Sequence, residues 1–370
     1  MEAAKKRNHQ IDFLRGLAIL TVIGRHPPIK SSQAGLLSDF SWYWYNCGWM
    51  GVDLFFVLSG FLIGSGLFAE IKAEGSLNVF RFLVKRAFKI WPGYIALMLF
   101  LSTGLTLDPV LRKNLIWNWL HLQNYVASCR VQTWSLAVEE HFYLFLPVVL
   151  LVLLRLKQIT LLPAVAASIA VFCLVGRFFD LKGAHSYSHL RMDSLFFGVL
   201  LAYLIKFRPN FAVAITRHRR LLFCLGAVIV GFISFLNLLD WYVLTIGLTL
   251  TYLGFGAILL ALISTTESDG VWGKLLFSPL AHGIAMIGFY SYGIYLWHIE
   301  FGFFPALALY PLLNGLPLSL SWLCEMILFV TFSVVFGTGM SRLIELPMLR
   351  LRDKIVPKLF PPEPSPSPRL

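Results

Sequence analysis

Long apolar runs separated by short polar segments dominate the chain. A helix needs about 20 mostly apolar residues to cross roughly 30 Å of hydrocarbon, and ten runs approach this length. The pattern predicts an all-α, polytopic membrane helical bundle of about ten transmembrane helices, of which the first and sixth are short. The runs lie near residues 11–26, 49–68, 87–107, 134–154, 159–176, 192–207, 221–239, 241–263, 284–310 and 318–341.

Composition agrees with lipid as the main solvent. Of the 370 residues, 58% are hydrophobic and only 14% are charged, against about 25% charged residues in soluble domains. Met1 to Gln10 lead straight into the first apolar run, so no cleaved signal peptide is expected. The five cysteines form no C-x-x-C pair, and neither a disulfide framework nor a metal site is predicted.

The net charge of +12 raises the question of nucleic-acid binding. Placing the amino terminus in the cytoplasm puts most of the 31 Lys and Arg residues in cytoplasmic segments, with the largest clusters at 81–89 and 206–220. This is the positive-inside distribution of a membrane protein. We therefore predict cytoplasmic termini, contact with membrane lipid and no nucleic-acid partner.

The chain is predicted to hold one membrane domain, residues 1–350, and a cytoplasmic Pro-rich disordered tail, residues 351–370. The tail is expected because five prolines in residues 361–368 cannot continue a helix or build a core. We find no convincing internal repeat.

Arg15 and His26 are polar positions inside the first apolar run. They are 11 residues apart, about three helical turns, so they share a face at a separation of about 16 Å. This spacing suits a long anionic donor that crosses the bilayer. Taken alone, Arg15 can equally be a membrane anchor and His26 a structural histidine.

A basic stripe precedes Pro92. Arg81, Lys85 and Lys89 repeat every four residues and are accompanied by Arg86. Such a stripe can hold the phosphates of a nucleotide cofactor. Spacing alone favours a topology signal in contact with anionic lipid.

Glu139, Glu140 and His141 open the fourth run. A carboxylate there can orient an imidazole and stabilise its protonated form, or it can pair with arginine for packing. Other polar residues in or near the runs are more often structural when judged singly, and Arg191 and Asp193, two residues apart, would not face each other on a helix. This group comprises Asp53, Arg191, Asp193, His298, Glu300 and Glu345.

Seven segments, in order, resemble motifs of the membrane acyltransferase-3 family. The resemblance covers the chain from about Ile11 to Pro347. Lys89 stands where the family motif has arginine, His141 where glutamine is common, and Glu300 where proline is frequent. The matching segments are Ile11–Ala18 with the Arg15-x10-His26 spacing, Gly51–Phe61, Arg86–Tyr94, Trp134–Tyr143, Arg191–Asp193, Ser291–His298 and Ile344–Pro347.

The resemblance implies a ten-span enzyme of the bacterial cytoplasmic (inner) membrane. It would move an acyl group, by preference acetyl, from cytoplasmic acetyl-CoA to a hydroxyl of a carbohydrate acceptor such as exopolysaccharide, lipopolysaccharide or peptidoglycan. By the same resemblance His26 is catalytic, Glu139 rather than Glu140 supports it, and Arg15 is essential. The residues assigned to donor binding are Arg86, Lys89, Lys85 and Arg15. The polar residues assigned to substrate binding or to structure are Asp53, Glu140, Arg191, Asp193, His298 and Glu345.

Several alternatives stay open on the sequence. Direct transfer and an acyl-histidine intermediate are both compatible with His26 as the reacting group. The acyl group can be succinyl or longer. A glycan or small-solute transporter or flippase also needs buried charge at mid-membrane, although no matching broken repeats are visible. The third possible function is that of a non-enzymatic partner protein in polysaccharide export.

Overall fold

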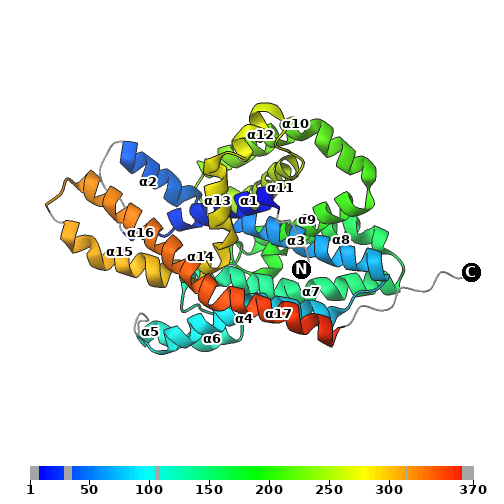
Figure 1. Ribbon diagram of the computed structural model, residues 1–370, viewed down its shortest axis with the longest axis horizontal. Coiled ribbons are helices and arrows are strands. Elements are labelled where there is room, and N and C mark those ends of the chain that lie inside the picture. Colours follow the sequence, from blue (N-terminus) through cyan, green and yellow to red (C-terminus); the bar gives the residue numbers. More distant parts are fainter. Residues whose placement is uncertain (1–7, 29–35, 105–108, 314, 361–370) are drawn as a thin grey trace, which may run out of the picture.

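The computed structural model describes residues 8–28, 36–104, 109–313 and 315–360, and all regular secondary structure in these ranges is helical (Figure 1). The first half of the chain contains α1 (His9–Gly24), α2 (Leu36–Cys47), α3 (Met50–Glu74), α4 (Val79–Ser102), α5 (Pro109–Arg112), α6 (Leu115–Trp119), α7 (Trp134–Arg155), α8 (Leu162–Phe179) and α9 (Ser188–Phe207).

The second half continues the same architecture. It contains α10 (Pro209–Ser234), α11 (Leu248–Ile263), α12 (Gly270–Leu276), α13 (Pro279–Phe289), α14 (Ser291–His298), α15 (Phe304–Leu309), α16 (Leu318–Met340) and α17 (Leu346–Leu359). Short 3-10 turns η1 (Val131–Thr133), η2 (Ile159–Leu161) and η5 (Tyr310–Leu313), and π-helical turns η3 (Val243–Gly247), η4 (Ile299–Phe303) and η6 (Ser341–Glu345), join or extend them.

Six helical segments of the described chain are long and apolar enough to cross a membrane. They are Asp39–Glu74, Val131–Arg155, Ile159–Phe179, Val243–Ile263, Ser291–Leu313 and Leu318–Leu359. The predicted polytopic membrane helical fold is therefore confirmed. The remaining predicted runs fall on α1, which has only 16 residues, and on α4, α9 and α10, which carry several charged residues.

Two predicted boundaries are wrong. The run at 284–310 is not one helix, because Tyr290 leaves the helical region (φ −94°, ψ 9°) between α13 and α14. The tail does not begin at residue 351, because α17 remains helical to Leu359. Residues 361–370, where a disordered tail is predicted, lie outside the described residues.

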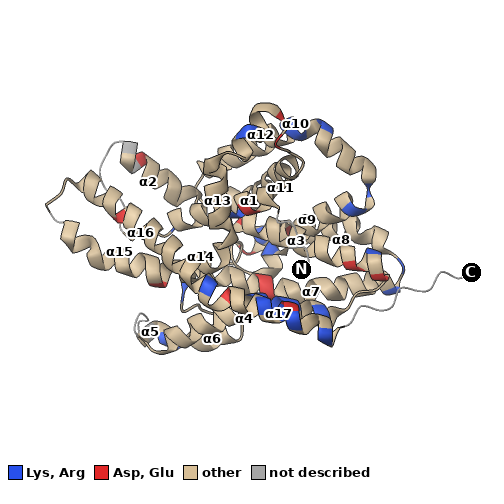
Figure 2. Cartoon of the chain, in the orientation of Figure 1, with Lys and Arg blue, Asp and Glu red and all other residues tan. Residues whose placement is uncertain are grey.

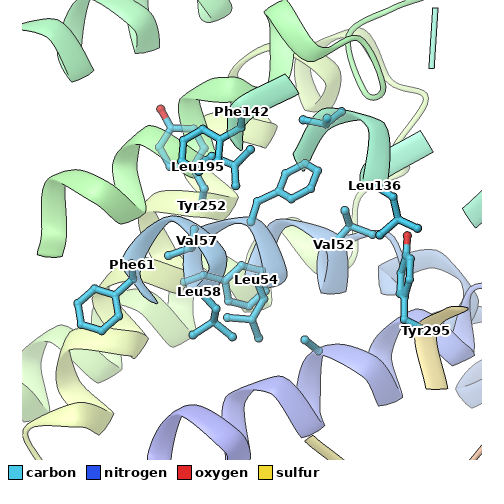
Figure 3. Close-up of a cluster of buried hydrophobic side chains, with 14 of the residues drawn as sticks. Val52, Leu54, Val57, Leu58, Phe61, Leu136, Phe142, Leu195, Tyr252 and Tyr295 are labelled. Atoms are coloured by element: carbon cyan, nitrogen blue, oxygen red, sulfur yellow. The ribbon is translucent and has the colours of Figure 1, made fainter. Parts of the chain in front are cut away.

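Glycines bring the central helices close together. A Cβ at Gly60 of α3 would lie 1.9 Å from the Leu195 carbonyl oxygen of α9, and one at Gly198 of α9 would lie 2.3 Å from the Val57 carbonyl oxygen. Small residues at such crossings let backbones pack closely in membranes. Around this crossing, Leu58, Leu195 and their neighbours form a buried apolar cluster (Figure 3).

Charge is unevenly distributed over the helices. Figure 2 shows basic residues along α17, whereas α15 and α16 contain no Lys or Arg. The segment α17 packs against α4, whose first half carries the basic stripe. Both clusters therefore lie together in the folded chain.

Candidate functional site

The two polar residues of the first apolar run, Arg15 and His26, each line one of two neighbouring cavities. One, of about 130 Å³, has His26 in its wall; the other, of about 70 Å³, has Arg15 and Glu139. Val52 of α3 and Tyr295 of α14 line both cavities, and Figure 3 shows these two side chains close to Leu136 of α7. Arg15 and His26 therefore line two separate cavities that share part of one wall.

His26 lies just beyond the end of α1. The helix ends at Gly24, with Arg25 as its C-cap residue, and Pro27 and Pro28 follow. Because a residue before proline avoids the helical region, the chain leaves the helix here. The backbone N–H of His26 still donates to the Ile23 carbonyl at 3.0 Å.

His298, at the end of α14, is the side chain that meets His26. Its Nε2 lies 3.2 Å from Nδ1 of His26, and the ring centroids are 5.1 Å apart. The Nδ1 of His298 lies 2.7 Å from the Tyr295 carbonyl oxygen. His298 is fully buried, so its ring is fixed between a backbone carbonyl and the second imidazole.

Glu139 does not support His26, and this prediction is corrected by the structure. Its carboxylate accepts hydrogen bonds from Ser59 Oγ at 2.8 Å and from the Tyr143 hydroxyl at 2.7 Å. Its neighbour in the cavity wall is Arg15, which makes no hydrogen bond or ion pair with the described residues. Since α7 places Glu139 at the Arg15 cavity, its carboxylate does not line the cavity that contains His26.

Glu140 points to neither cavity. Its Oε2 accepts from Trp91 Nε1 of α4 at 3.4 Å, and the adjacent His141 Nδ1 is 2.6 Å from Ser188 Oγ of α9. The Glu300 carboxylate pairs with Arg130. None of these residues contacts His26.

The basic stripe is only partly available for a ligand. Arg81 pairs with Glu70 and Glu74 at 2.8 and 2.5 Å, and Lys89 pairs with Glu345 of η6. Lys85 is exposed. Two of the three residues of the stripe therefore already have carboxylate partners.

Arg86, which accompanies the basic stripe, has no carboxylate partner within ion-pairing distance among the described residues. Its guanidinium lies 6.0 Å from the Tyr143 ring centre, and its Nε is buried without a hydrogen-bond partner among the described residues. Tyr143 in turn donates to Glu139. Arg86 is therefore linked through Tyr143 and Glu139 to the cavity that contains Arg15.

Two buried ion pairs fix the helices around the site. Arg191 pairs with Asp53 of α3 at 2.5 Å, and Asp193 pairs with Arg177 of α8 at 2.8 Å. The prediction that Arg191 and Asp193 do not face each other is confirmed. Arg177 was missed in the sequence because it follows directly after the predicted run at 159–176, whereas α8 continues to Phe179.

Unpartnered polar atoms line the cavity that contains His26. Among the described residues, Trp49 Nε1, Gln132 Oε1 and both Nε and Nη1 of Arg191 are buried without hydrogen-bond partners. Buried polar atoms left unsatisfied cost free energy, so a hydroxyl-rich ligand in this cavity would be stabilised by them. Trp49 and Gln132 lie two residues before the Gly51–Phe61 and Trp134–Tyr143 motifs. Their position next to these motifs is the sequence feature from which they could have been predicted as site residues.

His185 adds a neutral ring to the same wall. It lies between α8 and α9, and burial, with Arg191 and Arg25 nearby, lowers its pKa to about 4. The ring is therefore uncharged near neutral pH and can both donate and accept a hydrogen bond. The wall of this cavity thus combines hydrogen-bonding groups of both kinds.

Comparison with known proteins identifies the class. The model of the acyltransferase-3 family, described as an acyltransferase domain, matches residues 8–342, and the chain belongs to this family. The predicted family membership is thereby confirmed.

Two relatives illustrate the breadth of the match. The chain is 30% identical over 325 residues to the peptidoglycan O-acetyltransferase OatA of Listeria monocytogenes, covering 80% of this chain and 49% of the relative. It is 25% identical over 325 residues to the O-acetyltransferase OatA of Staphylococcus aureus, covering 78% and 49%. The chain thus spans about half the length of these relatives. No solved structure matches the chain.

Proposed function

We propose that the chain is a membrane O-acyltransferase that moves an acetyl group from cytoplasmic acetyl-CoA to a hydroxyl of a carbohydrate acceptor. The observation that carries this proposal is the pair of adjoining cavities that runs from Arg15 to His26 through Val52 and Tyr295. The names of the relatives, one of which acts on peptidoglycan, support a glycan as acceptor.

The proposed topology has ten crossings in a bacterial inner membrane, with both termini in the cytoplasm and a single domain that extends through α17 to Leu359. The six apolar segments, together with α1, α4, α9 and α10, supply the crossings. The joint position of the basic residues of α17 and of the first half of α4 supports a single cytoplasmic face there.

Donor binding is assigned to the basic residues near this face. Arg86, Lys85 and Lys89 would contact the phosphates of the nucleotide, and Arg15 the inner end of the donor, with the pantetheine arm extended toward His26. Arg86 and Arg15 have no carboxylate partner within ion-pairing distance among the described residues, which favours them over Lys89 as phosphate ligands.

The chemistry is a direct transfer. Nε2 of His26 takes the proton of the acceptor hydroxyl while the oxygen attacks the thioester carbonyl carbon, which gives a tetrahedral oxyanion. The oxyanion collapses, the carbon–sulfur bond breaks, and the protonated imidazole returns its proton to the leaving thiolate. Trp49 and Arg191 carry the unpartnered N–H groups available to the oxyanion or to the hydroxyls of the sugar.

The decisive experiment uses the purified protein in lipid nanodiscs with radiolabelled acetyl-CoA and a peptidoglycan-type glycan. Label should appear on the glycan as a base-labile ester. Substitution His26→Ala should lower the rate by at least about 100-fold, the scale of lost general-base catalysis, with unchanged membrane insertion. His282→Ala, at an exposed histidine of α13, is the matched control.

Two results would overturn the proposal. One is an active His26→Ala enzyme; the other is wild-type protein that transfers no label to any glycan tested but transports the glycan across the bilayer. Label retained on His26 itself after a donor-only incubation would replace direct transfer by the acyl-histidine route.

A further inference from the structure

The imidazole of His298 has a hydrogen-bonding pattern that its surroundings determine. Its Nδ1 is 2.7 Å from the carbonyl oxygen of Tyr295, and a carbonyl oxygen can only accept, so this nitrogen carries a proton. The ring is fully buried, and the carboxylate nearest to it along the chain, Glu300, is paired with Arg130. An unpaired charge is costly in such a place, so the ring is neutral and its Nε2 is an acceptor.

The pattern continues to His26. Since Nε2 of His298 accepts, the nitrogen 3.2 Å away, Nδ1 of His26, must be the donor. A neutral imidazole with its proton on Nδ1 has its lone pair on Nε2. Through these two contacts, the carbonyl of Tyr295 favours Nε2 as the basic nitrogen of His26.

We propose that His298 is a positioning residue that holds His26 in the tautomer protonated at Nδ1, so that Nε2 is the nitrogen that takes the proton of the acceptor hydroxyl. This inference rests on the proposed function. In the reaction the proton moves from the hydroxyl to Nε2 and later from Nε2 to the thiolate. The Nδ1 proton stays between the two rings, and His298 neither gains nor loses one.

Such an orienting group is commonly a carboxylate. Here the sequence offers Glu139 for that task, yet its oxygens are taken by Ser59 and Tyr143. A neutral imidazole fixes the tautomer as a carboxylate does, but it places no negative charge beside the ring. The cavity around His26 thus keeps an uncharged orienting group next to the arginines in its wall.

Three substitutions separate positioning from packing. In His298→Gln the side-chain oxygen can still accept from Nδ1 of His26; in His298→Asn the shorter amide can still reach Tyr295 but not His26; in His298→Leu neither bond remains. We expect kcat of the Asn and Leu variants to fall about 100-fold, that of the Gln variant to fall less than about 10-fold, and KM for acetyl-CoA to stay within twofold in all three. Equal activity of the Asn and Gln variants would overturn the proposal.

A spectroscopic test does not depend on activity. In protein with 15N-labelled histidine, the long-range nitrogen–proton spectrum distinguishes the two neutral tautomers of His26. The wild type and His298→Gln should show the Nδ1-protonated form, and His298→Leu should lose it. If the wild type shows His26 protonated at Nε2, the inference fails whatever the activity; if the tautomer is as expected but no glycan is labelled, only the proposed function fails.

Discussion

Asp53 and Arg191 are each about 1% exposed and join α3 to α9 beside the His26 cavity. Removing one partner of a buried ion pair leaves an uncompensated charge and typically costs 3–5 kcal/mol. We expect Asp53→Asn to lower the free energy of unfolding by about 3 kcal/mol, because the amide cannot balance the guanidinium. The measurement is denaturation in detergent, followed by circular dichroism.

The control for this substitution is Asp353→Asn on α17. Asp353 pairs with Arg352, but its side chain is 66% exposed, and exposed ion pairs contribute little to stability. If both substitutions lowered the melting temperature equally, the buried pair would not have the structural role assigned to it.

Single residues also show where prediction from sequence succeeds. The separation of Arg191 from Asp193 follows from helical spacing alone, and the structure gives each a partner on another helix. The meeting of His26 with His298 does not follow from spacing, because 272 residues lie between them. Glu139 was assigned to His26 on chemical type, whereas the rotation of α7 decides which cavity it lines.

Among the elements, the crossing of α3 and α9 depends on a missing side chain. A Cβ at Gly60 would lie 1.9 Å from a backbone oxygen, so the helices must separate to admit it. We expect Gly60→Ala to lower the free energy of unfolding by about 1–3 kcal/mol, the usual cost of overpacking. Thermal unfolding in nanodiscs measures this effect.

Gly66, on the same helix α3, is the matched control. A Cβ there meets no atom within 4 Å, and alanine favours a helix over glycine by up to about 1 kcal/mol. Gly66→Ala should therefore leave stability unchanged or raise it. A loss at Gly66 as large as that at Gly60 would mean that helix separation is not the cause.

Element positions were predictable where apolar runs are long and end at prolines or charges, as at α7 and α16. They were not predictable where the break has no sequence signal. Tyr290 divides the ninth run through its backbone angles alone, and α17 continues for 14 residues although it is rich in charge. Packing of α17 against α4 stabilises it, and such a contact cannot be read from local pattern.

At the scale of the whole molecule, the proposed donor site is tested most directly at Arg86. We expect Arg86→Gln to raise KM for acetyl-CoA about 10-fold, which corresponds to the loss of roughly 1.4 kcal/mol of binding, with kcat within twofold. Steady-state kinetics with varied donor concentration measure this change. Lys274→Gln, at an exposed lysine of α12, should leave both constants unchanged, and an unaltered KM in Arg86→Gln would remove Arg86 from the donor site.

The shared wall of Val52 and Tyr295 has a consequence for the cell as well as for the reaction. An open channel that connected both faces of the bilayer would let ions flow along their electrochemical gradient and collapse the membrane potential. Val52 and Tyr295, an aliphatic and an aromatic side chain, line both cavities; an apolar wall of this kind is poorly hydrated, so it resists the passage of small ions while a slender thioester arm can lie along it. The bound donor would then itself block the flow of ions through the protein. Without donor, the apolar side chains alone would have to prevent ion leakage.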